Sequence, residues 1–204
     1  MLDTVVGKLL AANILIFLAQ TVFGDGLIRW FGLWPLGLFG QGGGMSPPFL
    51  PWQMVTYGFL HGSILHLALN MYALWLFGSQ LERVWGPRRF TFYYFACLIG
   101  AALSQMVVSE FTLMHGGMAY PVIGASGAVF GLLLAFGLLF PYVRLMLLFP
   151  PIPIQARWFV LIYGLVELFA GVTGSMEGVA HFAHLGGMLT GWLILKGRIG
   201  RRRY

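Results

Sequence analysis

Charge is scarce in this chain. Of its 204 residues only 9% are Asp, Glu, Lys or Arg, whereas 59% are hydrophobic; soluble domains carry about 25% charged residues. So little charge excludes a water-soluble protein, because the polar side chains could not cover its surface. Apolar runs close to the roughly 20 residues that cross a bilayer recur along the sequence. We therefore predict an integral membrane protein built from helices.

Cysteine and acidic residues within the apolar runs are scarce too. The single cysteine, Cys97, excludes an intramolecular disulfide. Asp3 and Asp25 both lie outside the apolar runs, which excludes an intramembrane aspartyl protease, since that chemistry needs two buried aspartates. His181 and His184 have the spacing of a metal-binding pair, but no histidine is followed by the glutamate of the HExxH zinc proteases. We therefore expect no metal ion and no other cofactor.

Six apolar segments predict six transmembrane helices in a single all-α membrane domain that covers residues 1–204. The predicted spans are residues 8–23, 63–81, 90–108, 126–140, 158–172 and 179–195. No small-residue cleavage motif follows the first, which favours a retained span over a signal peptide. Residues 24–62 form a long, apolar connection rich in tryptophan, a residue that favours the headgroup boundary. We expect this first loop to lie in the outer leaflet.

The distribution of cations predicts the topology. If the N-terminus is cytoplasmic, Arg29 is the only cation in an outer segment. The cytoplasmic segments then hold Lys8, Arg83, Arg88, Arg89, Arg144, Arg157, Lys196, Arg198, Arg201, Arg202 and Arg203. This bias predicts that both termini are cytoplasmic. It also accounts for the net charge of +6, so we expect the lipid bilayer, and no nucleic acid, as a partner.

Polar residues inside a membrane are costly, so each is a candidate for function. In the predicted topology the second, fourth and sixth spans all descend from the outer face. They bring His66 and Asn70, then Ser126, then His184 to a similar depth. His61 lies just before the second span, at or just below the outer surface; its case is weaker, because a position in a solvated loop is the alternative.

Ser126 is the candidate nucleophile. A serine hydroxyl needs a base to take its proton, and His184 is the base at matching depth. Ser126 also begins a helix, whose free N–H groups suit a developing oxyanion. His66 and Asn70 share one helix face and both can donate hydrogen bonds to that oxygen. The alternatives are small-residue packing around the serine and interhelical hydrogen bonds that only hold the bundle together.

Two glycine stripes favour contact between the fourth and sixth spans. Gly127 and Gly131 are spaced as GxxxG, and so are Gly187 and Gly191. Such stripes let two helices pack at close range. We expect the two stripes to face each other and to bring the serine and the histidine within hydrogen-bonding distance.

These motifs resemble those of the rhomboid family of intramembrane serine proteases, in its compact bacterial form with six spans. The residues that carry the resemblance are Trp52, the run of His61, His66 and Asn70, the Glu82-Arg83-x-x-Gly86 segment, the Gly124-Ala125-Ser126-Gly127 segment, and the segment from Ala183 to Gly187 with Gly191. In one departure, Gln53 follows Trp52 where many rhomboids carry an arginine that supports the first loop.

The resemblance implies a serine endopeptidase of the bacterial inner (plasma) membrane that cleaves transmembrane protein substrates near the outer face. Ser126 is then the nucleophile, and His184 is the general base and later the general acid. His66, Asn70 and the Ser126 N–H are then expected to hold the oxyanion. The residues expected to support the site are Gly124, Gly127, Phe130, Gly187 and Gly191, with Phe130 packed against the histidine. Substrate is expected between the second and fifth spans, beneath a mobile cap at residues 174–178.

Two other functions stay open at this point. A non-catalytic rhomboid-like protein would bind membrane clients without cleaving them. A small transporter or channel would need polar residues along the whole bundle, and the sequence supplies them mainly in the outer half. Glu167 is the one acid inside a predicted span; we interpret it as a structural group, protonated or paired, with an ion path as the alternative.

Overall fold

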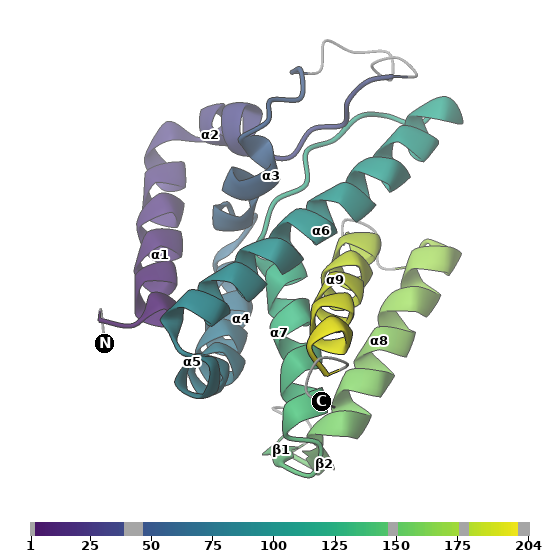
Figure 1. Cartoon of the computed structure of the whole chain (residues 1–204). Coiled ribbons are helices and arrows are strands. Elements are labelled where there is room, and N and C mark those ends of the chain that lie inside the picture. Colours follow the sequence, from purple (N-terminus) through teal and green to yellow (C-terminus); the bar gives the residue numbers. More distant parts are fainter. Residues whose placement is uncertain (1–2, 39–46, 147–150, 176–179, 200–204) are drawn as a thin grey trace.

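The computed structural model describes residues 3–38, 47–146, 151–175 and 180–199, and they are mostly helical (Figure 1). The elements are α1 (Val5–Phe23), α2 (Asp25–Phe31), α3 (Gln53–Thr56), the 3-10 turn η1 (Tyr57–Phe59), α4 (Ile64–Ala73), the π-helical segment η2 (Leu74–Gly78), α5 (Ser79–Trp85), α6 (Pro87–Met114), α7 (Ser126–Leu139), β1 (Arg144–Met146), β2 (Pro153–Gln155), α8 (Ala156–Thr173) and α9 (His181–Ile199). The two strands pair antiparallel as a short hairpin between α7 and α8.

Each predicted span coincides with a helix in the described part of the chain, but most of these helices are longer than predicted. The second continues through η2 to Trp85 and the third extends to Met114. Charged or polar residues suggested earlier ends, yet Glu82 and Glu110 are buried and bonded to backbone N–H groups elsewhere. A charged residue with such partners does not end a buried helix.

In the part of the chain that the structure describes, four helices are long and apolar enough to cross a membrane, namely α1, the continuous Ile64–Trp85 helix, α6 and α8. Helix α7 is apolar but has only 14 residues, about 21 Å at 1.5 Å per residue, against a hydrocarbon core of about 30 Å. Figure 1 shows that it begins part-way along α6, inside the bundle. The count of six spans and the outer-leaflet position of the first loop stay predictions.

Helix α9 lies between α6 and α8, with α7 behind it (Figure 1). Its glycine Gly187 faces α7 directly, because a side chain there would collide with the backbone of Gly127. Gly131 faces both α6 and α9, since a β-carbon there would lie 2.7 Å from Cβ of Cys97 and 3.2 Å from the carbonyl oxygen of Gly187. The expected close approach of α7 and α9 is therefore present.

Gly191 does not take part in that approach. A side chain at this position would collide with the hydroxyl of Tyr93 on α6. The neighbouring glycine, Gly186, faces Ser104 of α6 as well. The expectation that Gly187 and Gly191 form one stripe against α7 was wrong, because α9 packs at close range on two helices at once and divides its small residues between them.

Glu82, the first residue of the Glu82-Arg83-x-x-Gly86 segment, has a structural role. Its carboxylate accepts hydrogen bonds from the backbone N–H groups of Val5 and Val6, at 2.8 and 2.9 Å. These N–H groups belong to the first turn of α1, where no helical carbonyl can reach them. Glu82 thus caps α1 from α5, while Arg83 beside it is exposed.

Gln53 anchors the first loop in place of the arginine that many rhomboids carry. Its side chain is fully buried. The amide donates to the carbonyl of Trp30 and accepts from the N–H of Trp34, both at 3.3 Å. The indole of Trp52 donates to the same Trp30 carbonyl at 3.1 Å. A neutral side chain suffices here because the groups to be satisfied are one backbone donor and one backbone acceptor.

A second anchor holds the same loop from α6. The Glu110 carboxylate accepts from the N–H groups of Gly37 and Leu38, at 2.8 and 3.0 Å. An isolated bridge pairs Leu33 with Val122, just ahead of α7. The described part of the first loop is therefore tied both to α6 and to the segment that leads into Ser126.

Candidate active site

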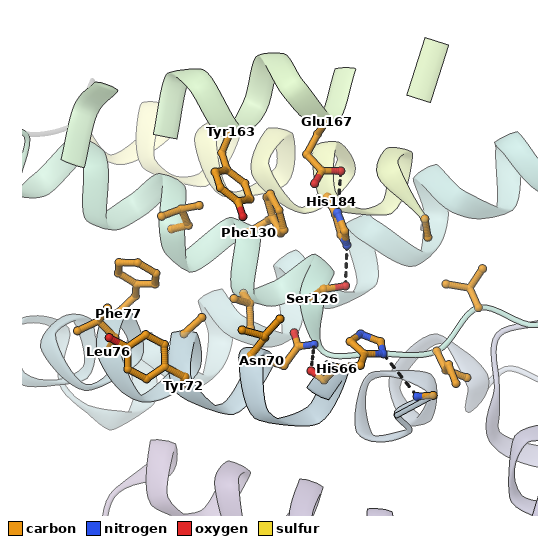
Figure 2. A pocket seen from close by; sticks show the side chains of 18 of the residues that line it. His66, Asn70, Tyr72, Leu76, Phe77, Ser126, Phe130, Tyr163, Glu167 and His184 are labelled. Carbon is orange, nitrogen blue, oxygen red and sulfur yellow. Dashed lines mark hydrogen bonds and ion pairs between the residues drawn. The ribbon is translucent and has the colours of Figure 1, made fainter. Parts of the chain in front are cut away.

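Ser126 and His184 meet where α7 and α9 cross. Ser126 is the first residue of α7 and His184 lies in the first turn of α9. Nε2 of the imidazole lies 2.8 Å from the serine Oγ (Figure 2). Both residues lie near the starts of helices that enter the bundle from the same end, and for this reason they lie at the same level.

The histidine ring is held on its face by Phe130. The two rings are stacked, with centroids 4.2 Å apart and an angle of 4° between their planes. Phe130 lies one turn after Ser126 on α7, so one helix carries both the serine and the stacking ring. Tyr163 of α8 packs behind Phe130, with ring centroids 5.8 Å apart.

Glu167 of α8 contacts the other side of the histidine. Its Oε2 lies 2.8 Å from Nδ1 of His184 and 2.7 Å from Nδ1 of His181. All three side chains are buried; Glu167 is 7% exposed. A carboxylate, an imidazole and a hydroxyl therefore form one hydrogen-bonded series across α8, α9 and α7.

His66 and Asn70 of α4 lie opposite, across from the serine (Figure 2). The amide of Asn70 donates to the His66 carbonyl at 2.9 Å. The N–H of Gly62 donates to Nδ1 of His66 at 3.4 Å, so a neutral ring carries its proton on Nε2. Both α4 side chains, like Ser126 and His184, line the same cavity.

Gly124 makes room for the His66 ring. Its φ is +129°, a region that residues with a side chain rarely adopt. A β-carbon there would also lie 2.9 Å from Cε1 and Nε2 of His66. The edge of the ring that carries Nε2 is therefore packed against the backbone that leads into Ser126.

His61, for which a solvated loop position was the alternative, is buried. It is only 2% exposed and lies edge-on to His66, with ring centroids 5.0 Å apart. Its backbone is bonded to the side chain of Gln20 on α1, which ties this part of the chain to that helix. Burial, followed by the neighbouring charge of His66, lowers the pKa of His61 from 6.5 to about 4.

A cavity of about 1020 Å³ joins these groups. The polar side chains gather at one end of it, and apolar residues of α4 and η2 face α8 along the rest (Figure 2). The lining includes Leu69, Tyr72, Leu76 and Phe77 on one side and Phe159 and Tyr163 on the other. The space suits an extended peptide segment whose side chains are mostly apolar.

Glu167, His181 and His184 also form a group that a metal ion could bridge, since their ligand atoms lie within 4.8 Å of one another. Sequence reasoning rejected a metal because no glutamate follows a histidine in the chain, and it did not consider an acid from another helix. Glu167 lies six residues before the end of α8, about 9 Å at 1.5 Å per residue. The depth argument, applied to the fifth span as well, would have placed it level with His184.

Comparison with known proteins agrees with this geometry. The Rhomboid domain family model matches residues 48–200. Rhomboid protein 1, mitochondrial, of Saccharomyces cerevisiae is 33% identical over 148 residues, which are 71% of this chain and 42% of that protein. The human Presenilin-associated rhomboid-like protein, mitochondrial, is 31% identical over 201 residues, 95% of this chain and 48% of that protein.

Rhomboid protease GluP of Bacillus subtilis is 40% identical over 82 residues, 40% of this chain and 14% of that protein. The chain thus spans less than half the length of each of these relatives. The family match includes α4, η2, α7, α8 and α9, the helices that line the cavity. The chain belongs to the rhomboid family.

Proposed function

We propose that this chain is an intramembrane serine endopeptidase that cleaves transmembrane protein substrates with a dyad of Ser126 and His184. The observation that carries the proposal is the 2.8 Å contact between Ser126 Oγ and His184 Nε2 at the wall of a large cavity. A structural hydrogen bond alone would not need that cavity or the polar groups opposite. Membership of a family that includes a named protease supports the same reading.

In the acylation step Ser126 Oγ attacks the carbonyl carbon of the scissile peptide bond while its proton passes to His184 Nε2. The Oγ–C bond forms and the carbonyl oxygen becomes an oxyanion. When the carbonyl reforms, the C–N bond breaks and His184 returns the proton to the leaving amine. In deacylation a water gives a proton to His184 while its oxygen attacks the acyl carbon. When the carbonyl reforms, the bond between the acyl carbon and Ser126 Oγ breaks, and His184 returns the proton to Oγ.

His66 and Asn70 are the proposed oxyanion donors, together with the N–H of Ser126. The Gly62 contact leaves Nε2 of His66 as the donor, and that edge lies beside Gly124. Donors fixed before the reaction stabilise the developing charge without reorganisation. Loss of one such donor costs about 10²–10³ in kcat.

The apolar part of the cavity is the proposed substrate channel. It lies between α4–η2 and α8, the second and fifth predicted spans. A substrate helix must unwind there, because its scissile carbonyl has to be free of its helical N–H partner to reach Ser126 Oγ. The cap is expected at residues 174–178, and residues 176–178 lie outside the described part of the chain.

The membrane orientation is part of the proposal. The start of α1, the end of α9, the hairpin of β1 and β2, and the start of α8 lie at one end of the bundle (Figure 1). Arg144 belongs to β1, and Arg157 belongs to the first turn of α8. The positive-inside rule assigns that end to the cytoplasm, and the catalytic side chains then lie toward the outer face. Arg201 to Arg203 lie outside the described residues. We propose six spans and the bacterial plasma membrane as the location.

The test is cleavage of a reporter with one transmembrane helix by the purified chain in detergent and in lipid vesicles. Wild type should cleave it, and Ser126→Ala and His184→Asn should lose activity by about 10³-fold or more. Ser104→Ala is the matched control, since its hydroxyl donates to the Phe182 carbonyl at 2.9 Å away from the cavity. It should keep cleaving.

A covalent probe reads the nucleophile directly. A fluorophosphonate should label Ser126, with an Oγ–P bond replacing the P–F bond, fluoride leaving and the serine proton passing to His184. Cleavage or labelling that persists in Ser126→Ala refutes the proposal. Binding of the reporter without cleavage by wild type would favour a non-catalytic client-binding protein.

A further inference from the structure

The catalytic histidine is bound on both sides. Nε2 of His184 faces Ser126, and Nδ1 faces Glu167 at 2.8 Å. The same carboxylate oxygen takes a second contact from Nδ1 of His181 at 2.7 Å. A dyad needs neither the carboxylate nor the second imidazole.

We propose that Glu167 completes a triad with His184 and Ser126, as a positioning residue, and that His181 holds the carboxylate in place. This inference rests on the proposed protease function. It replaces our interpretation of Glu167 from the sequence as a structural group. Glu167 acts through the histidine, and Figure 2 shows it on the far side of that ring from the serine.

The first role of Glu167 is to select the tautomer of His184. A carboxylate accepts only, so the nitrogen that faces it carries the proton. With the proton on Nδ1, Nε2 has a free lone pair directed at Ser126 Oγ, as a general base requires. The stacked ring of Phe130, 4.2 Å away, restrains the same imidazole in its plane.

The second role is electrostatic. When the serine proton reaches His184, a cation forms in a buried site where charge is poorly solvated. A carboxylate at hydrogen-bonding distance offsets that cost, as in other serine hydrolases. His181 reduces the cost of keeping the carboxylate itself in the membrane, because it supplies a second donor to the same oxygen.

A metal ion bound by Glu167, His181 and His184 would place the proton of His184 on the other nitrogen. It would need the Nδ1 lone pair of His184, which moves the proton to Nε2. The histidine could then donate to Ser126 but could not accept its proton. A bound metal would therefore inhibit, and the triad and the metal site exclude each other at His184.

Glu167→Gln is the main variant, and Glu82→Gln is its matched control. Both carboxylates are buried and accept two hydrogen bonds, but Glu82 caps α1 away from the cavity. We expect Glu167→Gln to lower kcat by about 10²–10⁴-fold with KM nearly unchanged. Glu167→Asp keeps the charge and should recover part of the loss. Glu82→Gln should lower thermal stability and leave kcat close to that of wild type.

His181→Leu tests the support of the carboxylate. It removes a donor from Oε2 and leaves the contact between Glu167 and His184. We expect a kcat loss of about 10-fold, smaller than that of Glu167→Gln. Equal losses in the two variants would contradict the assigned order of roles.

The tautomer of His184 can be measured by nitrogen NMR on wild-type protein with 15N-labelled histidine. This experiment does not depend on whether any variant folds. His184 should carry its proton on Nδ1 and have an unprotonated Nε2 at neutral pH. The opposite tautomer, an unchanged kcat in Glu167→Gln, or activity that requires a divalent metal would each overturn the triad. If instead wild type and Ser126→Ala behave alike, the protease proposal itself fails.

Discussion

A single added methyl group, in Gly187→Ala, tests whether the close approach of α7 and α9 positions Ser126 and His184. Gly187→Ala would place its β-carbon against the carbonyl oxygen of Gly127 and 2.7 Å from the carbonyl carbon. That is roughly 1 Å short of ordinary van der Waals contact. The neighbour is backbone and cannot rotate away, so the helices must separate.

Two magnitudes follow from that separation. Overpacking by one methylene costs about 1–3 kcal/mol of unfolding free energy. The same shift of about 1 Å would lengthen the 2.8 Å contact between Ser126 and His184 beyond hydrogen-bonding range, and misplacement of that size costs about 10²-fold in rate. We therefore expect Gly187→Ala to lose both stability and cleavage.

Gly197→Ala is the control on the same helix. A β-carbon at Gly197 meets nothing within 4 Å, so the substitution should be neutral or stabilise α9 by a few tenths of a kcal/mol, up to about 1. Thermal unfolding in detergent and cleavage of the reporter would be measured for both variants. Equal stability and activity of the two would refute the argument that the α7–α9 contact positions the dyad.

Three further predictions concern the surroundings of the site. Gln53→Ala should lower stability by about 1–3 kcal/mol, because it leaves the Trp34 N–H without its partner and removes one of the two donors to the Trp30 carbonyl; a melting temperature equal to that of wild type would contradict this anchoring role. Gly124→Ala should abolish cleavage with a smaller loss of stability, since the added carbon meets the His66 ring and φ is +129°; retained kcat would argue against His66 as an oxyanion donor. The pKa of His61 is lowered from 6.5 to about 4 in the folded protein. Between these two pH values the unfolded chain therefore binds more protons than the folded protein. The free energy of unfolding should have its full value above pH 6.5 and fall by up to about 3 kcal/mol toward pH 4. The pH dependence of melting should flatten in His61→Asn and persist in a variant of the exposed His115.

Sequence reasoning located the helices and the dyad because both depend on local signals. Apolar runs mark spans by their cost in water, and an intramembrane serine or histidine stands out against them. The depth argument then needed only the topology and the rise per residue of a helix. It brought Ser126, His184, His66 and Asn70 to one cavity without any knowledge of tertiary packing.

The features that escaped prediction depend on contacts between helices. Gly191 faces α6 and not α7, because α9 packs closely against both helices. The GxxxG spacing on one helix does not show which neighbouring helix its glycines contact. The backbone of His61 exchanges two hydrogen bonds with the side chain of Gln20, a residue on another helix. The partners of Gln53 are backbone groups of the first loop, which no spacing rule reveals.

Stability and chemistry are joined in the series of hydrogen bonds from Glu167 through His184 to Ser126. It links α8, α9 and α7, so each polar group that the membrane disfavours is offset by a partner on a neighbouring helix. A variant that removes one member leaves another buried and unpaired, at a cost of about 1–3 kcal/mol. Loss of activity in such a variant is evidence for a catalytic role only when its stability loss matches that of a control such as Glu82→Gln, where a buried carboxylate is lost without the histidine.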